Sequence, residues 1–189
     1  MSHVDRTARL RIVLDDTEPA IWRTVEVPLT ISLKGLHEVI QAAMPFEDEH
    51  LFGFRIDGKH YTVPDAEFDT PETYSAELMT LRAVWEEGIR QFAYTYDFGD
   101  NWQHTITVEE VFEADPVAEY PRLLAGEGRA PPEDVGGTFG YEEFQDALED
   151  PDHREHASLV DWCGGSFDPS TMDVEMIRAR MGRLVRAKR

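Results

Sequence analysis

The feature that most constrains this fold is a pair of alternating segments on either side of residues 99–101. Apolar side chains occupy every second position before the turn, and a similar set follows it: Phe92, Tyr94, Tyr96 and Phe98, then Trp102, Ile106 and Val108. Such alternation predicts two half-buried strands, and Gly99-Asp100-Asn101 is typical of a hairpin loop. To keep both apolar sets on one face, Phe98 must face Trp102 and Tyr96 must face His104, so Asp97 points away from His104. The other register brings Asp97 and His104 together but splits the aromatic stripe.

The first half of the chain repeats the hairpin pattern. Residues 10–14 and 21–27 alternate on either side of a polar turn, and residues 50–56 and 61–63 alternate on either side of Asp57-Gly58, a strong two-residue turn signal. Between these pairs, residues 33–43 follow the helical period after Ser32, a capping residue, and Pro45 ends the helix. Residues 78–87 also fit one helical face. These patterns predict three hairpins and one or two helices.

The composition changes after residue 113. Residues 114–140 are rich in proline, glycine and charge and predict a long loop, whereas helical periodicity returns from residue 141 onward. A chain of 189 residues is within the size of one domain. We therefore expect a single α+β domain over residues 1–189. Residues 1–113 would form mainly an antiparallel sheet of hairpins, and the helical portion 141–189 would pack on that sheet.

Charge and cysteine content limit the class of protein. The net charge of −20 disfavours nonspecific binding to nucleic acid, because an acidic body repels phosphate. Residues 178–189 nevertheless carry six cations and no acid. This basic tail either binds nucleic acid or complements its own helix dipole on the acidic surface. A single cysteine excludes an internal disulfide, and no apolar segment is long enough to span a bilayer. We expect a soluble, cytoplasmic protein with no membrane partner.

Three groups of polar residues are candidates for chemistry. Asp97, Asp100 and His104 could form a divalent-metal or acid–base site, or else the carboxylates hold the turn and His104 pairs with Tyr96. A second group lies in the loop that contains Pro131-Pro132, namely Arg129, Glu133 and Asp134. There the arginine would be an internal counter-ion. That loop could instead be a rigid structural segment or an interaction surface.

The third group surrounds two histidines in the helical portion. Asp152, His153 and His156 fall within one helical turn and could hold a metal ion. Capping and surface pairing are the structural alternative for these residues. No cofactor motif is evident, although a divalent metal is compatible with either histidine-containing group.

Several motifs occur together in a fixed order. They are Pro19–Arg23, His50-Leu51-Phe52-Gly53-Phe54, Tyr94–His104, Glu127–Gly137, Asp150–His156 and Phe167-Asp168-Pro169. In this order they resemble the plasmid pRiA4b ORF-three-like family over nearly the whole chain. The resemblance implies an α+β fold and an association with plasmids or insertion elements, but it brings no agreed catalytic residues. A transposon-resolvase label used in that family conflicts with the chemistry here, because Ser158, Ser166 and Ser170 lie among acids and glycines rather than arginines.

Two functions follow from these observations. We favour a non-enzymatic binding or accessory domain with a plasmid or mobile-element association and an unknown protein or small-molecule partner. The alternative is a metal-dependent hydrolase or nuclease with an Asp/Glu/His cluster. In that case Asp97 needs partners from the loop containing Pro131-Pro132 or from the acidic helix, because its own hairpin directs it away from His104.

Overall fold

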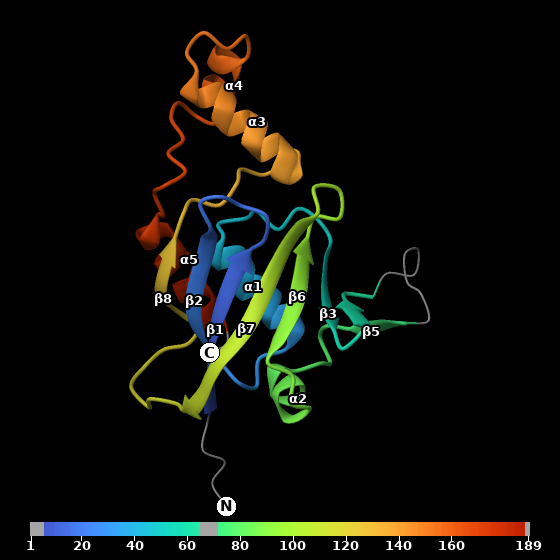
Figure 1. Cartoon of the computed structure of the whole chain (residues 1–189). Coiled ribbons are helices and arrows are strands. Elements are labelled where there is room, and N and C mark those ends of the chain that lie inside the picture. Colours follow the sequence, from blue (N-terminus) through green and yellow to red (C-terminus); the bar gives the residue numbers. More distant parts are fainter. Residues whose placement is uncertain (1–5, 65–71, 188–189) are drawn as a thin grey trace, which may run out of the picture.

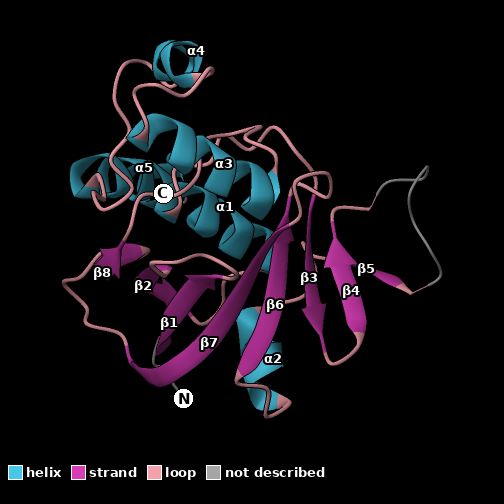
Figure 2. Cartoon of the chain, turned by 45° about the horizontal axis from the view of Figure 1, so that its top comes forward, coloured by secondary structure: helices cyan, strands magenta, loops and turns pink. Residues whose placement is uncertain are grey.

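The computed structural model describes residues 6–64 and 72–187, and these residues form one mixed sheet with helices packed around it (Figures 1 and 2). The strand order is β5-β4-β3-β6-β7-β1-β2-β8. The strands are β1 Arg6–Leu14, β2 Ile21–Pro28, β3 Phe52–Ile56, β4 Lys59–Thr62, β5 Thr73–Ser75, β6 Gln91–Tyr96, β7 Trp102–Glu113 and β8 Arg122–Glu127. The helices are α1 Leu33–Ala43, α2 Leu81–Glu86, α3 Gly137–Glu149, α4 His156–Trp162 and α5 Val174–Ala187. The expected α+β class is confirmed.

The sheet is mixed rather than wholly antiparallel. Consecutive strands pair as β1–β2, β3–β4 and β6–β7, while β3–β6, β1–β7 and β2–β8 join strands that are distant in sequence. The β4–β5 pair is parallel. The strand β8 lies inside the segment 114–140, which the sequence had indicated to be a loop throughout. Leu123 is buried there and Arg122 pairs with the buried carboxylate of Glu26 at 2.6 Å, so tertiary contacts order this short strand.

The register of the β6–β7 hairpin differs from the predicted one. Tyr96 faces Trp102 and Tyr94 faces His104, so the connection comprises residues 97–101. Asp97 and Asn101 both adopt left-handed backbone conformations, with φ of 54° and 58°, and the Asn101 amide donates to the Asp97 carbonyl. The aromatic stripe therefore ends at Tyr96, and Phe98 is 47% exposed in the turn.

The core lies between the sheet and the helices α1 and α5, which cover one of its faces (Figure 2). Ser32 caps α1 as predicted, since its hydroxyl accepts the Gly35 amide at 3.1 Å. The last helix, α5, packs against α1 and β8 through Ile177 and Met181.

The remaining helices lie at opposite ends of the sheet. Helices α3 and α4 lie beyond one end of the strands, with α2 at the opposite end (Figure 1). The expected helical portion therefore packs on the sheet mainly through α5, and α3 reaches it through an edge contact of Tyr141 with Trp102. In the described part of the chain, no helix has both the length and the apolar character needed to cross a membrane.

Candidate functional site

The pairing of β3 with β6 brings His50 beside Asp97. These strands are antiparallel with Phe52 opposite Tyr96, so the residues that precede β3 and follow β6 meet at the same end of the sheet. The Asp97 amide donates to the Leu51 carbonyl at 2.9 Å, which extends the ladder by one step. Two polar residues more than forty positions apart in the sequence are thus neighbours.

The carboxylate of Asp97 has two distinct roles. Its Oδ1 accepts the Gly99 amide at 2.9 Å and so holds the turn, as one of the alternatives from the sequence anticipated. Its Oδ2 lies 3.8 Å from His50 Nε2. The side chain is largely buried, and one of its oxygens remains available to a ligand shared with His50.

Glu133 reaches the same point from the loop between β8 and α3. Its Oε1 accepts the hydroxyl proton of Tyr96 and lies 3.7 Å from His50 Nε2. Its Oε2 accepts the Glu47 amide at 3.3 Å. Burial raises the pKa of Tyr96, and the hydrogen bond to the Glu133 carboxylate raises it further, so this phenol remains a donor at all physiological pH values. The bond orients Glu133 toward the imidazole.

Asp134 completes the cluster. Its backbone is left-handed, with φ of 57°, and this conformation places Oδ1 only 3.0 Å from His50 Nε2. Nε2 is buried, yet none of the described residues forms a hydrogen bond with it. Because 3.0 Å is short enough for a hydrogen bond, the orientation of the two groups is what prevents one. Three acidic oxygens thus lie within 4 Å of the imidazole nitrogen, and none of them forms a hydrogen bond with it.

The geometry of this cluster suits a divalent metal ion. One ligand atom each from His50, Asp97 and Asp134 lies within 4.8 Å of the other two. That spread is about twice a metal–ligand bond of roughly 2.1 Å, so one ion could contact all three after small side-chain movements. Carboxylate oxygens held so close together repel one another unless a cation neutralises them. The cluster of His50, Asp97, Glu133 and Asp134 is hereafter the acidic cluster.

Asp100 and His104 lie outside the acidic cluster. Asp100 Oδ2 accepts the Gly136 amide at 3.0 Å and so fastens the hairpin turn to the start of α3. His104 is fully buried, its Nδ1 bonds the Trp102 carbonyl at 3.1 Å, and burial lowers its pKa to about 4. The expected pairing of His104 with Tyr96 is wrong, because the register places Tyr94 opposite it. His104 is therefore a core residue.

Arg129 is not a counter-ion for its neighbours in the loop. Its guanidinium stacks on Phe167, 4.3 Å from the ring centroid, and no ion pair with Glu133 or Asp134 forms. Of the basic tail, Arg178 pairs with Glu175 at 3.6 Å and Arg180 donates to the Phe46 carbonyl. Lys188 and Arg189 lie outside the described residues.

The histidines of the third group have local roles. His153 Nδ1 accepts the Glu155 amide at 3.2 Å, and His156 Nδ1 bonds the Ala147 carbonyl at 2.9 Å. Asp152 is exposed at the turn between α3 and α4, where its amide bonds Asp150 Oδ1. These three residues do not form a metal-binding group within the described ranges. His153 does line a cavity of about 580 Å³ whose wall includes Asp134.

From the sequence, His50 was predicted only to be part of a strand and of a motif. Its place beside Asp97 depends on the β3–β6 pairing, which joins strands separated by β4, β5 and α2. Local periodicity carries no information on that pairing. The available signal was the loop containing Pro131-Pro132, since its Glu133 and Asp134 approach the same imidazole nitrogen as Asp97 does.

Comparison with known proteins identifies the family. The model of the plasmid pRiA4b ORF-3-like protein family matches residues 6–176. The uncharacterized protein y4hQ of Sinorhizobium fredii (strain NBRC 101917 / NGR234) is 41% identical over 193 residues, which cover 98% of this chain and 99% of that protein. The crystal structure of MM3350 from Methanosarcina mazei Go1, a protein of unknown function, is 33% identical with a TM-score of 0.83, covering 90% of this chain and 97% of that one. These relatives carry no assigned reaction. The chain belongs to the plasmid pRiA4b ORF-3-like protein family.

Proposed function

We propose that this protein binds a divalent transition-metal ion at the acidic cluster, with His50, Asp97 and Asp134 as ligands. The observation that supports this most directly is the buried Nε2 of His50, which has no hydrogen-bond partner among the described residues and lies within 4 Å of three carboxylates. Glu133 lies close enough to be a fourth ligand or to orient a metal-bound water. One imidazole combined with several carboxylates favours Mn²⁺ or Zn²⁺ over Ca²⁺, which prefers oxygen ligands alone.

A metal-dependent hydrolase is the second candidate. It is favoured by the position of Glu133, which belongs to the acidic cluster and also lines a cavity of about 630 Å³. A divalent metal lowers the pKa of a bound water and thereby supplies a nucleophile beside that cavity. If no hydrolysis accompanies metal binding, the protein is a metal-containing binding domain, in keeping with the function favoured by the sequence. The plasmid association rests on the family description alone.

The test compares two histidines. We expect titration calorimetry with Mn²⁺ and with Zn²⁺ to show one site per chain, and His50→Ala to weaken it by more than about 100-fold. His153→Ala is the matched control and should bind as the wild type does. Tyr96→Phe removes the donor that orients Glu133 and should weaken metal binding about tenfold. Equal losses in His50→Ala and His153→Ala, or no binding to the wild type, would reject the proposal.

Hydrolysis is tested separately. The wild type loaded with Mn²⁺ should cleave p-nitrophenyl phosphate or bis-p-nitrophenyl phosphate if the second candidate is right, and His50→Ala should not. A metal-loaded protein that cleaves neither ester leaves metal binding as the function and removes the hydrolase from consideration for these ester classes.

A further inference from the structure

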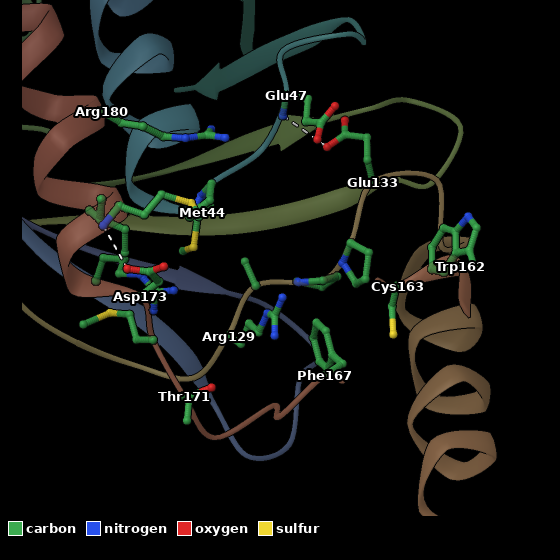
Figure 3. A pocket seen from close by; sticks show the side chains of 18 residues that line it. Met44, Glu47, Arg129, Glu133, Trp162, Cys163, Phe167, Thr171, Asp173 and Arg180 are labelled. Atoms are coloured by element: carbon green, nitrogen blue, oxygen red, sulfur yellow. Dashed lines mark hydrogen bonds between the residues drawn. The ribbon is translucent and has the colours of Figure 1, made fainter. Parts of the chain in front are cut away.

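A large cavity adjoins the acidic cluster (Figure 3). It has a volume of about 630 Å³ and lies between the end of α1, the start of α5, the loop at residues 129–133 and the segment at residues 162–167. This volume is within the range of small-molecule sites, which is roughly 300–1,000 Å³. Glu47 and Glu133 form the side nearest the acidic cluster.

Two arginines on the cavity wall form no ion pair with a carboxylate of the described residues, although carboxylates line the same cavity. The exposed guanidinium of Arg129 contacts the Phe167 ring and forms no ion pair or side-chain hydrogen bond with any of the described residues. Arg180 uses one nitrogen to bond the Phe46 carbonyl, which leaves further N–H groups for a ligand. Figure 3 shows the two side chains entering the cavity from different sides. Counting the buried Arg23, the lining carries three arginines against three carboxylates, Glu47, Glu133 and Asp173, so the cavity is locally less acidic than a chain of net charge −20.

Arg23 adds a third positive charge beneath the cavity. It is 1% exposed, and its guanidinium donates to the carbonyls of Ala43, Trp22, Glu127 and Gly128 at 2.7–2.9 Å. Burial lowers its pKa to about 10, so the group stays charged at neutral pH. Four of its five N–H groups are used in these bonds, so it contributes mainly an attractive field for an anion.

An apolar wall with aromatic rings adjoins Arg129 in this cavity. Trp162 is 50% exposed on the cavity lining, and Phe167, Pro131 and Pro132 lie beside it. The lining also includes three methionines, Met44, Met172 and Met176. Such a surface suits a planar apolar group, which can stack on aromatic rings and contact methionine sulfurs. The cavity thus offers cations to one part of a ligand and a flat apolar wall to another.

We propose that this cavity binds a small phosphate monoester with a planar aromatic body, such as a nucleoside monophosphate. The phosphate would lie between Arg129 and Arg180, and the aromatic body would lie against Trp162 and Phe167. A phosphate carries a charge of about −1.5 to −2 and three acceptor oxygens, which match two guanidinium groups better than a carboxylate does. This site goes beyond the proposed metal binding, because none of the groups assigned to the ligand belongs to the acidic cluster.

The test uses protein treated with a chelator, so that its outcome does not depend on a metal ion. Calorimetric titrations with AMP, adenosine, inorganic phosphate and benzoate separate the parts of the ligand. We expect AMP to bind, and adenosine and phosphate to bind at least about tenfold more weakly. Any of three results would overturn the proposal: adenosine binds as tightly as AMP, benzoate binds more tightly than AMP, or AMP does not bind.

Arginine variants locate the site. Arg129→Gln and Arg180→Gln should each weaken AMP binding by about tenfold or more, and the loss should shrink at high salt. Arg183→Gln is the matched control, because Arg183 is exposed on the same helix and does not line this cavity. Arg180 also supports the Phe46 carbonyl, so thermal unfolding of that variant shows whether its fold survives. The Arg129 side chain forms no hydrogen bond with the described residues, so unchanged AMP affinity in Arg129→Gln would overturn the assignment by itself.

Discussion

His104 and His50 occupy contrasting environments, although both lie near the β6–β7 hairpin. The rings of Phe46 and Tyr94 surround His104, with centroid separations of 5.9 and 5.3 Å, and its Nε2 has no hydrogen-bond partner among the described residues. His50 is partly exposed and its Nε2 faces acidic oxygens. Protonation is therefore costly at His104, whereas a cation is favoured next to His50.

The depressed pKa of His104 makes stability depend on pH. Burial lowers this pKa from 6.5 to about 4 in the folded chain. Between these two pH values the imidazole is protonated in the unfolded chain but neutral in the folded chain. His104 therefore does not reduce the free energy of unfolding above pH 6.5. As the pH falls from 6.5 to 4, its protonation in the unfolded chain lowers that free energy by about 3 kcal/mol. Urea unfolding of the wild type and of His104→Gln between pH 7 and pH 4 measures the difference in slope. Parallel curves would show that His104 is not the titrating group.

The β6–β7 turn and the start of α3 form one interlocked unit. Asp100 supplies an acceptor for the Gly136 amide, and a Cβ atom on Gly137 would lie 2.5 Å from the Asp100 carbonyl oxygen. Gly137 also has a φ of 71°, which side chains rarely tolerate. The close approach fixes the end of the loop that carries Glu133 and Asp134 relative to Asp97, so it also positions the acidic cluster.

A matched pair of glycine substitutions tests this contact. Gly137→Ala should lower the free energy of unfolding by about 2 kcal/mol or more, because backbone strain adds to a clash with backbone atoms. Gly182→Ala is the control, since a Cβ there meets nothing within 4 Å and alanine favours the helix α5. The free energy of unfolding of that variant should rise by up to about 1 kcal/mol. If chemical unfolding shows equal effects for the two variants, the turn and α3 are not locked together.

Elements with a strong local pattern were predictable from the sequence. The alternation in β1, β2, β3 and β6 and the Ser32 cap of α1 are local signals, and these elements formed where expected. The register of β6–β7 was not predictable, because Asp97 lies in the turn and its amide bonds Leu51, the residue before β3, which is distant in sequence. The strand β8 was missed because its burial against β2 is a tertiary contact. His50 was missed as a site residue for the same kind of reason.

At the scale of the whole molecule, the acidic cluster joins segments that are distant in sequence. His50 precedes β3, Asp97 follows β6, and Asp134 lies in the loop before α3. The chain also carries a net charge of −20, so its folded state concentrates like charge. A bound cation would both link the three segments and reduce the local repulsion, and an ion that binds the folded chain alone must stabilise it.

This linkage gives a prediction that separates specific binding from charge screening. With free Mn²⁺ at about 100 times its dissociation constant, the free energy of unfolding should rise by about 2.7 kcal/mol. Sodium chloride at equal ionic strength is the control, because screening alone also stabilises a highly charged chain. His50→Ala should keep the response to sodium chloride and lose the additional response to Mn²⁺. If Mn²⁺ stabilises the wild type no more than sodium chloride does, the cation acts on the general field of the protein and the acidic cluster does not bind it.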